Sequence, residues 1–208
     1  MKIIYEGKEL AVKWLTYYNK ENDNIVQGPL IEPIKIKTPI GKYEVDVIML
    51  FKDSQELEGV HFREMQIIKT DIGNLKTSSL HFYKNGQIES VDLDFFTKIK
   101  TIFGEIEISS KYSGLYFYKN GNIKKFWLLN PIKVKTAIGD LTLQKELSFY
   151  KNGKLKSGYS AGNFIHNIKF NKDFLFNFEK NGNLIITKSD WMKEKKDIVK
   201  TPIGEMLF

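Results

Sequence analysis

The sequence predicts an all-β protein built of tandem antiparallel β-hairpin repeats that form an elongated, solenoid-like meander sheet. Two observations predict this fold class. A motif centred on Lys-Asn-Gly recurs about every 32 residues over much of the 208-residue chain. A second motif, Lys-Thr-x-Ile/Phe-Gly, alternates with the first. Two motifs that alternate in phase predict that one structural unit is repeated along the chain.

The first motif has the composition of a hairpin tip, because Lys-Asn-Gly tolerates positive φ and is flanked by residues that favour strands. A two-residue Asn-Gly loop would place Tyr83 opposite Ile88, whereas a three-residue Lys-Asn-Gly loop would place Phe82 there. The second choice pairs apolar residues in every copy, so we expect a type I turn with a glycine bulge. The clear copies are Leu80–Ile88, Leu115–Ile123, Leu147–Leu155 and Phe176–Leu184, with an eroded copy at Ile48–Ser54.

The second motif follows short alternating runs such as Ile34–Lys37 and Ile132–Lys135. This alternation is typical of strands with one buried face, so the motif is interpreted as the turn at the opposite end of the strands. Each repeat then contains two antiparallel strands. The copies are Lys37–Gly41, Lys69–Gly73, Lys100–Gly104, Lys135–Gly139 and Lys200–Gly204.

The whole chain, residues 1–208, is predicted to form a single β-repeat domain of about six repeats of about 32 residues. Residues 1–30 and 188–208 are interpreted as capping segments, and 189–196 as either one helical turn or a charged loop. A content of 42% hydrophobic and 13% aromatic residues allows a large core and argues against disorder. No apolar stretch is long enough for a transmembrane helix, and charge appears too early for a signal peptide, so the compartment stays open.

The Phe-Tyr-Lys-Asn-Gly-x-Leu/Ile repeats resemble those of bacterial MORN-like repeat proteins, whose units centre on an aromatic-x-Asn-Gly-x-Leu hairpin. The stretch Leu147–Gly158 is the closest match, and the resemblance covers about residues 30–208. It implies stacked hairpins that serve as scaffolds, surface proteins or interaction modules. It implies no catalytic residues.

The sequence lacks recognisable catalytic chemistry. Cysteine is absent, and His61, His81 and His166 do not stand at metal-ligand spacing. Asp92 and Asp94 share a strand face, where they form either an acid–base pair or, as is commoner, part of a wet face. No phosphate-binding loop or nucleophile elbow occurs. We therefore expect a non-enzymatic protein with no catalytic residues, no metal site and no cofactor.

Equivalent tyrosines and lysines of the repeats form the best candidate for a binding site. Stacking in register would align Tyr83, Tyr118 and Tyr150 in a ladder, beside a row of tip lysines that includes Lys84, Lys119 and Lys151. Such a row could bind sugars, nucleobases or a protein. In the alternative, the tyrosines cover the second face of the sheet, packing on Trp127 or Trp14, and the net charge of +7 serves solvation.

These features predict a recognition or scaffolding protein that presents an extended β-sheet surface to a macromolecular partner. A protein is the expected partner, whereas nucleic acid or glycan has weaker support. The alternative is a closed β-barrel that binds a small ligand or acts as an enzyme, which would require a cavity with convergent polar groups. An outer-membrane barrel is a further alternative.

Overall fold

A computed structural model describes residues 1–20, 23–94, 96–109, 114–136, 139–165, 168–185, 199–201 and 204–206. All its regular elements are strands, which confirms the all-β prediction, and none of the described segments is a helix of the length and apolarity needed to cross a membrane. The strands are β1 (Lys2–Tyr5), β2 (Lys8–Ala11), β3 (Thr16–Lys20), β4 (Asp23–Thr38), β5 (Gly41–Phe51), β6 (Leu57–Thr70), β7 (Gly73–Phe82), β8 (Ile88–Leu93), β9 (Phe96–Thr101), β10 (Gly104–Ser109), β11 (Leu115–Phe117), β12 (Ile123–Leu128), β13 (Ile132–Thr136), β14 (Gly139–Phe149), β15 (Leu155–Ile165), β16 (Ile168–Phe178), β17 (Leu184–Ile185), β18 (Val199–Thr201) and β19 (Gly204–Met206).

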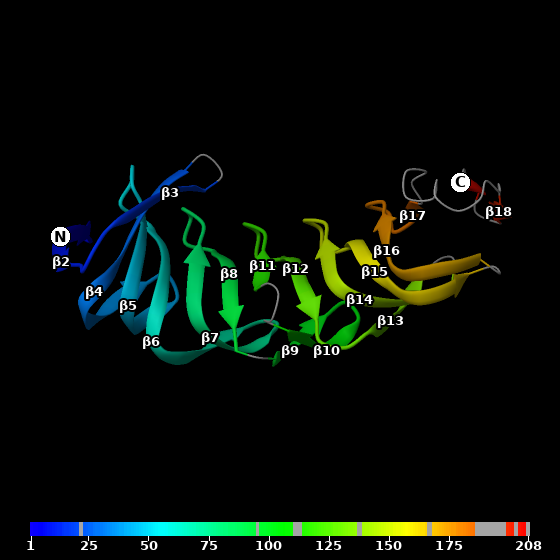
Figure 1. Ribbon diagram of the computed structural model, residues 1–208, viewed down its shortest axis with the longest axis horizontal. Coiled ribbons are helices and arrows are strands. Elements are labelled where there is room, and N and C mark those ends of the chain that lie inside the picture. Colours follow the sequence, from blue (N-terminus) through cyan, green and yellow to red (C-terminus); the bar gives the residue numbers. More distant parts are fainter. Residues whose placement is uncertain are drawn as a thin grey trace.

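Fifteen of these strands form one antiparallel sheet with a meander order, and β1–β2 and β18–β19 form separate pairs. The main path runs β17-β16-β15-β14-β12-β11-β8-β7-β6-β5-β4-β3, with β9, β10 and β13 attached beside it. Among the described strands the two ends of this path do not pair, so the sheet is open and the molecule is elongated (Figure 1). The closed barrel considered as an alternative is therefore wrong.

The Lys-Asn-Gly motifs form hairpin tips with the predicted three-residue loop. Phe82 pairs with Ile88, and the other three copies pair in the same way. The Tyr83 N–H donates to the Gln87 carbonyl at 2.8 Å, and the Gly86 N–H donates to the Tyr83 carbonyl at 2.8 Å. Gly86 has a φ of 78°, which a residue without Cβ adopts at low cost. The eroded copy forms the turn between β5 and β6.

The Lys-Thr-x-Ile/Phe-Gly motifs form turns at the other end of the strands, as predicted, and the structure shows that two residues separate the paired threonine and glycine. Thr38 pairs with Gly41, and its hydroxyl donates to the Gly41 carbonyl at 2.9 Å. The same threonine-to-glycine bond closes the turns that begin at residues 70, 101 and 136. This repeated bond fixes the turn in which glycine takes a positive φ.

Register shifts in the middle of the long strands divide the repeats into two rows of hairpins. In the β6–β7 pair, for example, the register shifts between His61 and Gln66. We call the hairpins that end in Lys-Asn-Gly the upper hairpins, and those that end in Lys-Thr-x-Ile/Phe-Gly the lower hairpins. Their tips lie along opposite long edges of the molecule (Figure 1). Bulges bend strands, which explains how one continuous meander forms both rows.

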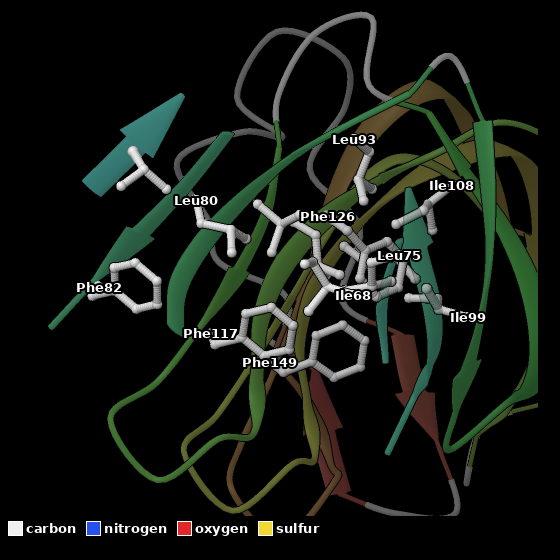
Figure 2. Packing of buried hydrophobic residues seen from close by; sticks show 14 of the residues in the cluster. Ile68, Leu75, Leu80, Phe82, Leu93, Ile99, Ile108, Phe117, Phe126 and Phe149 are labelled. Carbon is white, nitrogen blue, oxygen red and sulfur yellow. The ribbon is translucent and has the colours of Figure 1, made fainter. Parts of the chain in front are cut away.

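The main hydrophobic core lies between the two rows, and a second, small cluster consists of Ile25, Met49 and Phe51. The Leu-x-Phe positions of the upper hairpins, such as Leu80 and Phe82, are fully buried and belong to the same cluster as Leu75 and Ile99 of the lower hairpins (Figure 2). The rings of Phe103, at a lower turn, and Phe149, in an upper hairpin, are 6.2 Å apart. The core therefore joins successive repeats into one continuous body.

The N-terminal hairpin also belongs to this core. Ile3 and Val12 are buried in the main cluster, and the Tyr5 hydroxyl donates to the Lys37 carbonyl at 2.6 Å. These contacts are consistent with a capping role for the first residues. The helical turn considered for residues 189–196 lies outside the described residues.

Candidate functional site

The tips of the upper hairpins form a continuous edge, which we call the tip row and define as residues 83–87, 118–122, 150–154 and 179–183. The strands that carry these tips are consecutive neighbours in the sheet, so each tip lies beside the next (Figure 1). The structure therefore brings the predicted tyrosines and lysines together along one edge.

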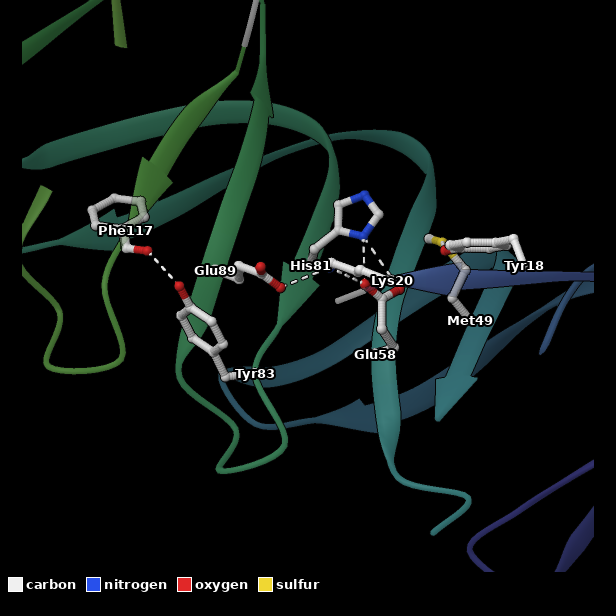
Figure 3. A network of polar contacts seen from close by, with 8 residues as sticks. All are labelled: Tyr18, Lys20, Met49, Glu58, His81, Tyr83, Glu89 and Phe117. Carbon is white, nitrogen blue, oxygen red and sulfur yellow. Dashed lines mark hydrogen bonds and ion pairs between the residues drawn. The ribbon is translucent and has the colours of Figure 1, made fainter. Parts of the chain in front are cut away.

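The three tyrosines of the predicted ladder connect each tip to the next hairpin. The hydroxyl groups of Tyr83, Tyr118 and Tyr150 donate to the carbonyl oxygens of Phe117, Phe149 and Phe178 at 2.7, 2.7 and 2.6 Å. The first of these bonds appears in Figure 3. The rings are half-buried. Their hydroxyl hydrogens are used inside the sheet, which favours a structural role for these tyrosines over direct contact with a ligand.

Amide and lysine side chains add further links between tips. The side-chain amides of Asn120 and Asn122 donate to the Lys151 carbonyl at 3.0 and 2.9 Å. The Lys154 ammonium reaches the Asn181 carbonyl at 3.5 Å. Because neighbouring loops are bonded to one another, the tip row holds its side chains in a fixed order.

The three predicted tip lysines lie in different environments. Lys84 forms an ion pair with Asp23 and lies 5.3 Å from the centre of the Phe51 ring; the hydrogen bond to Asp23 raises the pKa of Lys84. The Lys119 ammonium lies 5.5 Å from the centre of the Tyr83 ring. Lys151 is exposed.

Charge is distributed unevenly along the tip row. At the N-terminal end Lys84 lies near three carboxylates, those of Asp23, Asp53 and Glu56. The last three upper hairpins carry seven lysines beside the single tip carboxylate of Glu179. Lys125 pairs with Glu146 at 3.0 Å, and within the described part of the chain the other six form no ion pair. We call these six lysines the basic half of the tip row, and include Lys124 and Lys156, which lie in β12 and β15 just beyond the loops: Lys119, Lys124, Lys151, Lys154, Lys156 and Lys180.

A buried polar network lies on the outer face of the first repeats, where β3 crosses the sheet (Figure 3). The Glu58 side chain is fully buried, forms an ion pair with Lys20 and lies 3.1 Å from Nδ1 of His81. Lys20 also binds Glu89 at 2.7 Å. Burial alone would raise the pKa of Glu58, but hydrogen bonds from His81 and Lys20 outweigh it and hold this pKa below its ordinary value.

This network was not predicted from the sequence. The one signal in the sequence is an acidic residue, Glu58, in the apolar run Leu57–Val60. Burial, and to a lesser degree the nearby Glu58 carboxylate, raises the pKa of Tyr18 to about 12. None of the network residues lines a hollow that the structure describes on the protein surface; one such hollow, of about 560 Å³, lies between Tyr5–Gly7 and Lys84–Gly86. Each charge of the network is bonded to another member, so its evident role is to fix β3 on the sheet.

The remaining polar residues considered from the sequence do not converge. Asp92 accepts a hydrogen bond from Ser79 at 2.6 Å, whereas Asp94 pairs with Lys76 at 2.7 Å, so the two carboxylates have separate partners. His61 is exposed, and His166 lies outside the described residues. Among the described residues no cluster of three or more histidine, aspartate or glutamate side chains is arranged to hold a metal ion.

The resemblance to MORN-like repeats stays a prediction. No protein-family model matches the sequence, and comparisons with curated proteins and with solved structures gave no match.

Proposed function

We propose that this chain is a non-enzymatic recognition or scaffolding protein that presents its tip row to a macromolecular partner, most simply a protein. One observation carries the proposal: hydroxyl bonds from Tyr83, Tyr118 and Tyr150 fix successive tips into one continuous edge. An ordered edge of this kind can contact a partner at several points without losing much conformational freedom on binding.

The half-buried tyrosine rings of the tip row and the open sheet favour a protein over a glycan, a nucleic acid or a small molecule as the partner. Glycan or nucleobase binding by aromatic stacking needs free ring faces, whereas these tyrosine rings are half-buried. A small-ligand site would need an enclosed cavity lined by convergent polar groups. The sheet is open, which supports an extended contact surface.

The test is affinity capture from a lysate of the source organism with two matched variants. One variant replaces three exposed tip lysines, Lys119→Ala, Lys151→Ala and Lys180→Ala. The control replaces one exposed lysine in each of three lower hairpins, Lys69→Ala, Lys100→Ala and Lys133→Ala, with the same change in net charge. Capture of a defined protein that is lost only in the tip variant supports the proposal.

Two outcomes would overturn the proposed recognition role of the tip row. Equal loss of capture in both variants would show that the lysines act only through net charge. A screen in which small molecules raise the melting temperature while no protein is captured would favour a small-ligand or enzymatic role.

A further inference from the structure

We propose that the basic half of the tip row binds an extended acidic segment of a partner protein, with carboxylates at every third residue. This inference rests on the proposed function and names the chemistry of the partner. It follows from the sign, the spacing and the side-chain type of the charges on the last three upper hairpins.

The basic half carries positive charge that is exposed to solvent. Lys119, Lys151, Lys154, Lys156 and Lys180 are exposed, Lys124 is half-buried, and within the described residues none of the six has a carboxylate partner. The chain does supply such partners elsewhere, since Lys84 at the first tip is paired with Asp23. The last three tips therefore leave positive charge uncompensated within the described chain, which favours a partner of opposite charge.

The spacing follows from the sheet. Neighbouring strands lie about 4.8 Å apart, and each upper hairpin adds two strands, so equivalent lysines on successive tips recur about every 10 Å. Lys119, Lys151 and Lys180 occupy equivalent positions. A chain in the polyproline II conformation has about three residues per turn and rises about 3.1 Å per residue, so every third side chain returns to one side after about 9 Å. Carboxylates at this interval match the tip lysines.

The side-chain type argues against nucleic acid as the ligand. Proteins that bind single strands combine a basic groove with free aromatic rings, whereas the tip row is an edge and its tyrosine rings are half-buried. The basic half contains no arginine, the residue suited to bidentate phosphate contacts. Lysines act as separate point charges, which suits spaced carboxylates.

The test uses the full chain and two fluorescent peptides of about twelve residues, with identical composition. In the first peptide, glutamate occupies every third position, and in the second the same glutamates are adjacent. We expect tighter binding of the first peptide, and binding weakened about tenfold by Lys119→Ala, Lys151→Ala and Lys180→Ala together, since each exposed charge pair contributes modestly. The control Lys69→Ala, Lys100→Ala and Lys133→Ala should change affinity less than about twofold. Thermal unfolding confirms that both variants fold.

Equal binding of the two peptides would overturn the inference, because spacing would then be irrelevant. Tighter binding of an oligothymidylate of equal charge would replace it with nucleic-acid binding. If a protein captured from lysate is insensitive to the tip variant and neither peptide binds, a recognition role through another surface stands and the acidic-segment inference fails. Absence of any captured protein would instead count against the proposed function itself.

Discussion

Removing the tyrosine hydroxyls tests whether the ladder holds the repeats in register. The triple variant Tyr83→Phe, Tyr118→Phe and Tyr150→Phe keeps all three half-buried rings and deletes only the bonds of 2.6–2.7 Å to the next hairpin. If the hydroxyl groups served only to contact a ligand, their loss should leave the free energy of unfolding unchanged. Loss of the bonds should lower stability if the role is structural.

The size of the effect follows from the geometry of the bonds. A typical intramolecular hydrogen bond contributes about 0.5–1.5 kcal/mol to stability. The three bonds lie about one hairpin apart, near the distance at which effects add, so their sum is about 3 kcal/mol. For a chain of this length about 1 kcal/mol corresponds to roughly 2–4 °C, and we therefore expect the melting temperature to fall by about 6–12 °C.

Urea unfolding followed by circular dichroism measures this change. Tyr17→Phe is the control, because Tyr17 is 59% exposed and its hydroxyl has no hydrogen bond among those described. The control should shift stability by less than about 0.5 kcal/mol. A triple variant as stable as the control would refute the structural role and return the tyrosines to the candidate ligand site.

Three other changes test the buried network, the turn and the core. Glu58→Gln leaves Lys20 and His81 without their buried carboxylate and should lower stability by about 3 kcal/mol in urea unfolding; a loss under about 1 kcal/mol would contradict this. Because the folded pKa of Glu58 lies below its ordinary value of 4.5, its contribution is present above that pH and is lost as pH falls through the folded pKa, so the wild type should lose stability in acid more steeply than Glu58→Gln. Gly153→Ala should lower the free energy of unfolding by about 1 kcal/mol, because Gly153 has a φ of +83°, which alanine adopts only with strain. No atom lies within 4 Å of the added Cβ, so the loss would come from the backbone alone, and an unchanged unfolding midpoint would refute the requirement for a left-handed residue. Phe126→Ala, at a side chain that is 1% exposed, should cost about 3–5 kcal/mol, and a normal melting temperature would show that the core is not packed there.

The repeat architecture could be predicted because it depends on local chemistry. Only the three-residue loop puts apolar residues opposite each other in every copy, and the structure pairs Phe82 with Ile88 accordingly. The turn at Thr38–Gly41 was predicted from its position after alternating residues, although its threonine hydroxyl bond was not. Turn type and pairing involve residues close in sequence, so a single repeat contains the necessary information.

The division of each repeat into an upper and a lower hairpin could not be predicted in this way. It depends on register shifts such as the one between His61 and Gln66, which no residue in the motifs marks. The role of the tyrosines was also open. Their position predicted a row, but whether a hydroxyl meets a ligand or the next hairpin depends on the distance between repeats, which the sequence does not contain.

The buried network shows most clearly why the rest of the site required the structure. Lys20, Glu58 and Glu89 come from three separate strands, and they meet only because β3 crosses the outer face of the sheet. A buried ion pair adds little net stability over an apolar contact, but breaking it is costly, so such a pair acts mainly against wrong arrangements. A shift of β3 that separates Lys20 from Glu58 would leave this buried carboxylate with His81 but without its lysine partner. Backbone pairing with β4 already fixes the register of β3, and the network adds side-chain bonds that tie the end of β3 to β6 and β8.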